Sequence, residues 1–280
     1  MDTKMILALL SGWLLIGGVV TATPPRLTTE QVVTLTAPHE PCLVVRELGD
    51  SPEDDVTLSW GGDTCDAAVS PCSTFKIPHA LIALSSGVIA DQHEVIPWDG
   101  KKRWARSWNR DHDLSTAIPN SVFWFFQVTA RRLGPERMQQ HLDRLTYGNR
   151  DRSSGLDDFW LDGSLLITNH DQVDFLTRLA RRRLPYPAPL QRRVADLLVI
   201  ERGKAHVLRG KTGSGRPAPG RLRGWHVGWL ERSDRSTVVY ALRLEGGEGA
   251  WGPEAQRRSR ALLVEGGWLP GIAEATARED

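Results

Sequence analysis

The order of strand-like and helix-like segments limits most strongly how this chain can fold. Residues 30–70 read as strands joined by polar turns, and a helical stretch follows from about residue 74 to 184. Pro185-Tyr186-Pro187 ends that stretch. Within it, apolar residues recur at the three- and four-residue spacing of amphipathic helices, in the runs Ile77-Ala80-Leu81-Leu84, Phe126-Ala130-Leu133 and Val173-Leu176-Leu179-Ala180. The spacing therefore predicts an all-helical insert over about 74–185.

Extended segments resume after this insert. An amphipathic helix is expected near 189–202, and a last helix begins near Pro253, where proline suits the first helical turn. Between them lie three strand-like runs, which are Ala205 to Lys211, Gly224 to Glu231 and Thr237 to Leu244. We therefore expect an α/β (α+β) fold, in which terminal helices flank an antiparallel sheet and the helical lobe is inserted.

The first residues have the form of a secretory signal peptide. Lys4 supplies a positive charge, residues 5–20 are apolar, and Thr21-Ala22 offers a small-residue cleavage point. The apolar run is shorter than the roughly 20 residues of a membrane span, so cleavage near Ala22 is favoured over a membrane anchor. We expect a signal peptide at 1–22 and one domain at 23–280, secreted or periplasmic, without stable membrane association after cleavage.

Charge composition narrows the choice of partners. The 280 residues include 35 basic and 34 acidic side chains, for a net charge of +1. A balance this even gives no field for steering nucleic acid or an anionic membrane. Small molecules are therefore the expected partners, and both a monomer and a homodimer stay open.

Three cysteines gain meaning if the protein is exported. Cys42 opens one strand-like run and Cys65 closes the next, with a turn at 49–52 between them. A hairpin would bring the two cysteines together, so a Cys42–Cys65 disulfide is expected. Cys72 is then left over, either as a reactive thiol or, as we favour, as a small buried residue.

The leading chemical motif is Ser73-Thr74-Phe75-Lys76, just before a helical apolar pattern. Ser73 and Lys76 are three residues apart and share a helix face. A serine hydroxyl becomes a good nucleophile when a base removes its proton, and lysine can be that base if it loses its charge. Taken alone, the motif favours an N-cap serine with an exposed lysine one turn later.

A second motif, Lys211-Thr212-Gly213, ends a strand-like run. The glycine lets the backbone approach a ligand closely, and the lysine offers a cation to an anionic substrate. The pairing of Ser-x-x-Lys with Lys-Thr-Gly in this order is typical of β-lactamases and penicillin-binding proteins. A third candidate, Ser121 of Ser121-Val122-Phe123, could relay a proton to a leaving nitrogen.

At this density of motifs the chain resembles the class D (OXA-like) serine β-lactamases from about residue 40 to its C-terminus. The similar segments are Ser70 to Ile82, Pro97-Trp98-Asp99-Gly100, Tyr147-Gly148-Asn149, Phe159-Trp160-Leu161-Asp162-Gly163 and Gly224 to Trp229. The resemblance implies a serine β-lactamase/penicillin-binding-protein-like fold. It also implies hydrolysis of β-lactams through an acyl-enzyme on Ser73.

The resemblance implies that CO2 carboxylates Lys76 to a carbamate (N6-carboxylysine), which then acts as general base. Only a neutral amine attacks CO2, so the pocket must be dry. Residues of the right type for its lining are Phe75, Phe123, Trp160 and Leu161. Trp160 is expected to donate its indole N–H to the carbamate. No metal and no cofactor beyond CO2 or bicarbonate is expected.

The resemblance also assigns the substrate-binding groups. Lys211 and Thr212 would hold the substrate carboxylate together with an arginine near the start of the last helix, either Arg257 or Arg258. The backbone N–H groups of Ser73 and Ser214 would form the oxyanion hole beside Gly213.

Two departures from the family pattern leave substrate breadth open. Phe123 replaces a common valine, and its ring could alter carbamate stability or block the deacylating water. Ser214 stands where the family often has a bulky aromatic residue, which changes one wall of the cleft.

Three alternative functions remain. A penicillin-sensing domain would acylate without turnover, but such sensors follow membrane spans and a metalloprotease segment that this chain does not show. A D,D-peptidase often has asparagine in its second motif, which Ser121-Val122-Phe123 lacks. A class C-like enzyme would use Tyr147 as base, although the flanking sequence favours a structural role for Tyr147.

Overall fold

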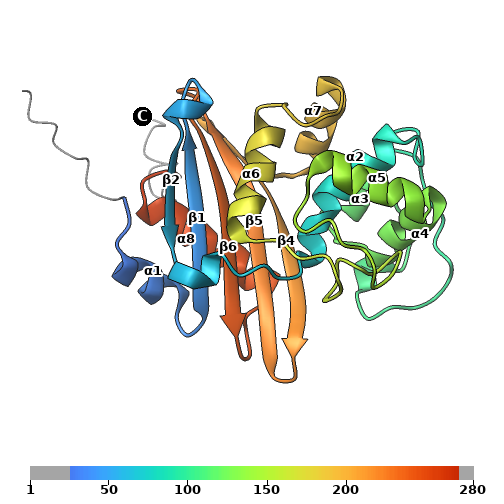
Figure 1. Cartoon of the computed structure of the whole chain (residues 1–280), viewed down its shortest axis with the longest axis horizontal. Helices are drawn as coiled ribbons and strands as arrows, with labels where there is room; N and C mark the ends of the chain where they lie inside the picture. The colour runs from blue at the N-terminus through green and yellow to red at the C-terminus, as the bar shows by residue number, and fades with distance from the viewer. Residues whose placement is uncertain (1–25, 271–280) are drawn as a thin grey trace, which may run out of the picture.

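The computed structural model describes residues 26–270 and is built around one antiparallel sheet (Figure 1). The strand order is β2-β1-β6-β5-β4-β3, so the hairpin from the first part of the chain adds to strands from the last part. The strands are β1 (Glu40–Leu48), β2 (Val56–Trp60), β3 (Val199–Arg202), β4 (His206–Ala218), β5 (Arg221–Arg232) and β6 (Thr237–Gly246).

Helices cover both faces of this sheet. α1 and α8 pack on one face, while α6 and the lobe that contains α2 to α5 and α7 lie on the other (Figure 1). The helices are α1 (Thr29–Thr36), α2 (Lys76–Ser85), α3 (Leu114–Ala117), α4 (Phe123–Leu133), α5 (Pro135–Leu145), α6 (Asn169–Ala180), α7 (Ala188–Leu197) and α8 (Gly252–Glu265). The expected antiparallel sheet with terminal helices and an inserted helical lobe is confirmed.

The alternating sides of the strands separate two hydrophobic cores. On β1, Val44 faces the core shared with the helical lobe, whereas Leu43 and Val45 face the core under α1 and α8. Every second residue of a strand points to the same face, so one strand serves both cores. The sheet therefore separates the core of the lobe from the core under the terminal helices.

Residues 29–36 form helix α1, and the expectation of strands from residue 30 onward is wrong for this segment. Thr28 caps the helix with a capping box, in which its hydroxyl accepts from Gln31 N and its own N–H donates to Gln31 Oε1. The β-branched residues of this segment suggest a strand, but the cap and the packing of α1 against α8 determine a helix.

Two further boundaries differ from expectation. α7 ends at Leu197, and Val199–Arg202 is the edge strand β3, where Glu201 pairs with Leu208 of β4. The lobe is also less helical than predicted, because much of 86–113 is loop. Side-chain hydrogen bonds organise this loop, such as the one from Trp98 N to Asp111 Oδ1 at 2.8 Å.

A disulfide joins Cys42 of β1 to Cys65, with 5.3 Å between the two Cα atoms. Cys65 lies in a short 3-10 turn, Gly62–Cys65, that follows β2. The link ties the segment that leads toward Ser73 to a central strand of the sheet. Cys72 is free and buried.

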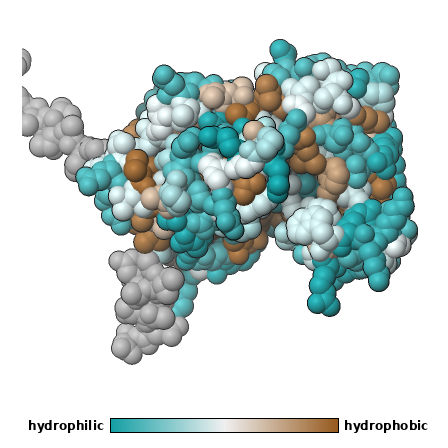
Figure 2. Space-filling view, turned by 90° about the horizontal axis from the view of Figure 1, so that it is seen from below, coloured by the Kyte–Doolittle hydropathy of each residue, from teal (hydrophilic) through white to brown (hydrophobic). Residues whose placement is uncertain are grey.

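Hydrophobic residues are scattered in small areas over the face shown in Figure 2 and do not gather in one large patch. No helix within residues 26–270 is long and apolar enough to span a bilayer. The predicted signal peptide at 1–22 lies outside the described residues.

Candidate active site

Ser73 lies in a 3-10 turn, Cys72–Phe75, that runs directly into α2. The turn starts at Cys72, whose φ of 51° is in the left-handed region. Thr74 then fixes the turn by donating its hydroxyl proton to Pro71 O at 2.7 Å. This geometry places Ser73 Oγ 2.8 Å from Lys76 Nζ, within hydrogen-bonding distance.

Lys76 is buried, with 1% of its surface exposed. Burial removes water from the ammonium group and so holds the pKa of Lys76 well below its usual value, and the nearby charge of Lys211 lowers it further. The Nζ atom also lies 5.4 Å from the centre of the Phe126 ring. An amine with a depressed pKa next to a hydroxyl is an arrangement suited to proton abstraction.

Trp160 packs beside Phe75, which precedes Lys76 in the chain, and is fully buried. Its ring stacks on Phe75 at 5.3 Å and meets the edge of His79 at 5.4 Å. The indole Nε1 has no hydrogen-bond partner among the described residues. A buried N–H without a partner costs about 1–3 kcal/mol, so this donor fits a group with an acceptor oxygen beside Lys76.

Phe123 brings the start of α4 to Trp160, and Ser121 lies two residues before it. Ser121 lies just before α4 with a φ of 53°, and Ser121 N donates to Ile118 O at 3.0 Å. Phe123 is half-buried and its ring lies 6.2 Å from that of Trp160. The Phe123 ring, which stands where the family commonly has valine, therefore packs near Trp160.

The Lys-Thr-Gly segment of β4 packs directly against the nucleophile turn. A Cβ atom at Gly213 would lie 3.0 Å from Pro71 O, so a larger residue would force the two segments apart. Lys211 is buried, and burial lowers its pKa to about 7. Its Nζ donates to Thr212 O at 2.9 Å. The two sequence motifs thus meet at one place in the fold.

The two arginines proposed for the substrate carboxylate lie elsewhere. Arg257 is exposed and pairs with Glu254 at 2.6 Å, while Arg258 donates to Leu35 O at the end of α1 and also pairs with Glu254. The part of α8 that does reach the motif is Gly252, whose N–H donates to Ser214 Oγ at 3.0 Å. Both arginines therefore have partners away from the Lys-Thr-Gly segment, and a role for either in binding the substrate carboxylate stays a prediction.

Tyr147 is buried in the lobe core, and its hydroxyl donates to Gln172 Oε1 at 3.4 Å. Burial raises the pKa of this phenol, which makes the phenolate a costly species there. A structural role for Tyr147 follows from this position.

Sequence reasoning missed three residues that contact the Trp160 segment. Hydrogen bonds of Ser70 to Trp160 O and Asp162 N connect the nucleophile turn to the Trp160 segment, and the His79 ring packs against the Trp160 ring. No spacing rule marks a serine or an aspartate in a loop as a connector, so the only available signal was their presence within the family-like segments. Within residues 26–270, no group of three or more His, Cys, Asp or Glu side chains could hold a metal ion.

Comparisons with known proteins agree with this geometry. Residues 45–263 match the family described as penicillin binding protein transpeptidase domain. The chain is 40% identical to the β-lactamase OXA-2 of Salmonella typhimurium over 63% of this chain and 62% of that protein. It is 40% identical to the β-lactamase OXA-3 of Pseudomonas aeruginosa over 69% of this chain and 68% of that protein.

A solved structure extends the likeness to the fold. The class D β-lactamase from Bacillus subtilis superposes with a TM-score of 0.79 at 32% identity, covering 88% of this chain and 100% of that one. The chain therefore belongs to the penicillin binding protein transpeptidase domain family and, within it, to the class D β-lactamases.

Proposed function

We propose that this protein hydrolyses β-lactams through an acyl-enzyme on Ser73, with carboxylated Lys76 as the general base. One observation carries the proposal. A buried lysine amine lies 2.8 Å from the serine hydroxyl, and Trp160, whose indole N–H has no partner, packs on the neighbouring Phe75. Within residues 26–270 no carboxylate pairs with Lys76. A carboxyl group on Lys76 would give the Trp160 indole N–H an acceptor and would be stabilised by that hydrogen bond.

The residues present fit a carboxylated lysine. Phe126 lies under the Lys76 amine, and Phe75 stacks on Trp160 beside it; burial among such rings favours the neutral amine that attacks CO2. When bound, the carboxyl group supplies an anionic base, which the amine alone does not. Trp160 Nε1 is the donor available to hold it.

The proposed reaction has two halves. In the first, Ser73 Oγ gives its proton to the base and bonds to the lactam carbonyl carbon, the carbon–nitrogen bond breaks, and that proton passes from the base through Ser121 to the leaving nitrogen. In the second, a water gives one proton to the base while its oxygen bonds to the ester carbonyl carbon, the Ser73 ester bond breaks, and the base returns the proton to Ser73 Oγ. The backbone N–H groups of Ser73 and Ser214 would stabilise the oxyanion in both halves.

Substrate binding rests on β4. Lys211 and Thr212 would hold the substrate carboxylate, because their segment packs against the nucleophile turn. An anionic group placed there would raise the pKa of Lys211 from about 7 and so keep it charged.

Acylation without turnover is the alternative that one specific contact favours. The Phe123 ring packs near Trp160, where the deacylating water must reach the base. If this ring excludes that water, the protein would bind penicillins covalently and release them slowly, as a sensor does. A D,D-peptidase activity has no comparable observation in its favour.

We also propose export, with cleavage near Ala22 and a mature protein of 23–280 in the periplasm. N-terminal sequencing of the protein from a bacterial periplasmic fraction tests this. A mature chain that still starts at Met1 would contradict it.

Turnover of the chromogenic β-lactam nitrocefin tests the main proposal. Protein depleted of CO2 should lose most of its turnover and recover it when bicarbonate is added, and Ser73→Ala should be inactive under both conditions. Ser85→Ala, at the other end of α2, is the matched control and should behave as wild type. A stoichiometric burst without turnover at any bicarbonate concentration would favour the sensor alternative.

A further inference from the structure

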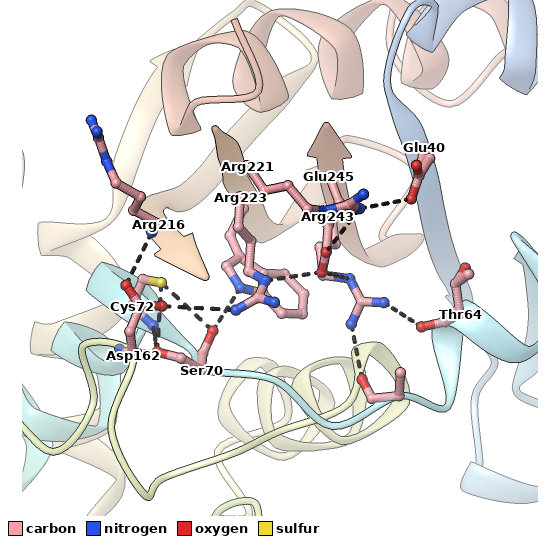
Figure 3. Close-up of polar contacts among 12 residues, drawn as sticks. Glu40, Thr64, Ser70, Cys72, Asp162, Arg216, Arg221, Arg223, Arg243 and Glu245 are labelled. Atoms are coloured by element: carbon pink, nitrogen blue, oxygen red, sulfur yellow. Dashed lines mark hydrogen bonds and ion pairs between the residues drawn. The ribbon is translucent and has the colours of Figure 1, made fainter. Parts of the chain in front are cut away.

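The Ser70 hydroxyl is the junction between the nucleophile turn and the segment that carries Trp160 (Figure 3). Ser70 is 2% exposed and lies three residues before the nucleophile. Its Oγ donates to Trp160 O at 2.8 Å and accepts from Asp162 N at 2.9 Å. It also accepts from Cys72 N at 3.3 Å, so one buried oxygen contacts both segments.

The Trp160 segment is anchored beyond this junction as well. Asp162 has a φ of 50°, and its carboxylate accepts from Arg216 N at 3.0 Å and lies 3.8 Å from Arg223 (Figure 3). Arg223 is itself held by Glu245 at 3.0 Å. The segment is thus fixed to β4 and β5 on one side of Trp160 and to Ser70 at Trp160 itself.

The segment on the other side of the junction is fixed just as firmly. Trp225 Nε1 donates to Ser70 O at 3.0 Å, and Arg243 donates to Ala67 O at 2.9 Å. A short antiparallel bridge between Val69 and Ile167 joins the two loops further along. That bridge does not touch the Trp160 peptide, so the Ser70 hydroxyl is the group among these contacts that bonds the Trp160 backbone directly to the turn.

We propose that Ser70 is a positioning residue, which holds the Trp160 indole N–H at the distance from Lys76 that favours the carboxylated lysine. This inference rests on the proposed function. Lys76 begins α2 directly after the turn, whereas Trp160 comes from a separate loop. Their relative position therefore depends on cross-links between the two loops, and a donor displaced by even a fraction of an ångström binds its acceptor less well.

The test is the bicarbonate requirement of Ser70→Ala. This variant leaves the Trp160 carbonyl and the Asp162 N–H without their partner, so the Trp160 peptide can shift. We expect the bicarbonate concentration that gives half-maximal nitrocefin turnover to rise about tenfold, which corresponds to the loss of one hydrogen bond in strength. Saturating bicarbonate should restore most of kcat, because the nucleophile and base are unchanged.

Ser164→Ala is the matched control. Ser164 lies in the same segment, where its Oγ donates to Asp151 O at 3.2 Å and accepts from Ser154 N at 3.1 Å, but it does not contact Trp160. The control should loosen the loop and leave the bicarbonate requirement as in wild type. If Ser70→Ala does not fold, Ser70→Cys is measured instead, since a thiol keeps the volume and bonds more weakly.

The outcomes separate this inference from the proposed function. A raised requirement in the Ser70 variant and not in Ser164→Ala supports it. A bicarbonate-dependent wild type with an unshifted Ser70 variant, or with equal shifts in both variants, would overturn the positioning role alone. Full wild-type turnover after removal of CO2 would overturn the proposed function, and this inference with it.

Discussion

A fully buried histidine beside each face of the sheet allows the two faces to be compared, because the two rings have different partners. His226, on the face under α8, has both ring nitrogens in contact with a hydroxyl, Nδ1 with Ser259 and Nε2 with Tyr240. His79, on the lobe face, contacts Thr129 through Nε2 and leaves Nδ1 without a partner. Burial lowers the pKa of each to about 3, so both are neutral at pH 7.

The difference extends to the residues around each histidine. The lobe face also carries Trp160 with its unpartnered N–H and the Lys76 amine, whose pKa burial holds well below its usual value. Backbone strain gathers on the same side, at Cys72, Ser121 and Asp162, all with positive φ. The histidine under α8 is thus fully hydrogen-bonded, whereas the residues near Lys76 include two unpartnered ring N atoms.

Replacing the buried lysine should separate activity from stability most sharply. Lys76→Met removes the base and should lower kcat/KM by about 10³-fold or more. Because a buried amine contributes little to folding, the thermal midpoint should stay the same or rise. Steady-state kinetics and thermal unfolding on one sample measure both, and a strongly destabilised or still active variant would contradict the distinction between the faces.

The pH profile should depend on the two lysines of the lobe face in opposite directions. Protonation of Lys76 abolishes its reaction with CO2, so kcat/KM falls as pH drops through its lowered pKa. Lys211 holds a carboxylate only when charged, so kcat/KM should also fall above its pKa of about 7, by about tenfold per pH unit. Lys211→Arg keeps its charge and should move only the alkaline limb to higher pH. An unmoved limb would contradict this assignment.

On the α8 face a comparable change should affect stability alone. Ser259→Ala leaves His226 Nδ1 without a partner and should reduce the free energy of unfolding by about 1–2 kcal/mol. Denaturant titration measures this loss. The bicarbonate requirement and kcat should match wild type, and a change in either would show that the two faces are coupled.

Phe123→Val tests how closely the lobe face controls water. Removing the ring that packs on Trp160 should speed deacylation several-fold, at a cost of about 1 kcal/mol in stability for the lost buried area. Burst kinetics separate acylation from deacylation. A slower deacylation step in the valine variant would mean that Phe123 supports the base rather than shielding it.

The smallest effect is expected at Arg257. Its ion pair with Glu254 is exposed, and such pairs contribute about 0–1 kcal/mol. Arg257→Ala should therefore leave KM for a carboxylate-bearing β-lactam within about twofold of wild type. A tenfold rise in KM would instead support Arg257 as a ligand of the substrate carboxylate.

Residues in short motifs were predictable because their chemistry depends on local spacing. Ser73 and Lys76 are about one helical turn apart, which sequence spacing reveals. Gly213 is needed because its strand passes so close to Pro71 that a Cβ atom would not fit well. The pairing of Cys42 with Cys65 was also predictable, since a hairpin brings the two cysteines together.

Features that depend on tertiary contacts were not predictable. The β-branched residues of α1 suggested a strand, and the helix becomes clear only from its cap and its packing on α8. Arg257 and Arg258 were chosen by sequence position, although their helix directs them to Glu254. The role of Ser70 could not be read from the sequence, because the group its hydroxyl bonds to, Trp160 O, lies in a loop distant in sequence.

Incorporation of labelled bicarbonate tests the central claim most directly. Protein incubated with ¹³C-bicarbonate should show one carbamate carbon signal per molecule by NMR, which is lost in Lys76→Met and on acidification. Retention of full nitrocefin turnover with no such signal would contradict the account, since Lys76 would then act as an unmodified amine.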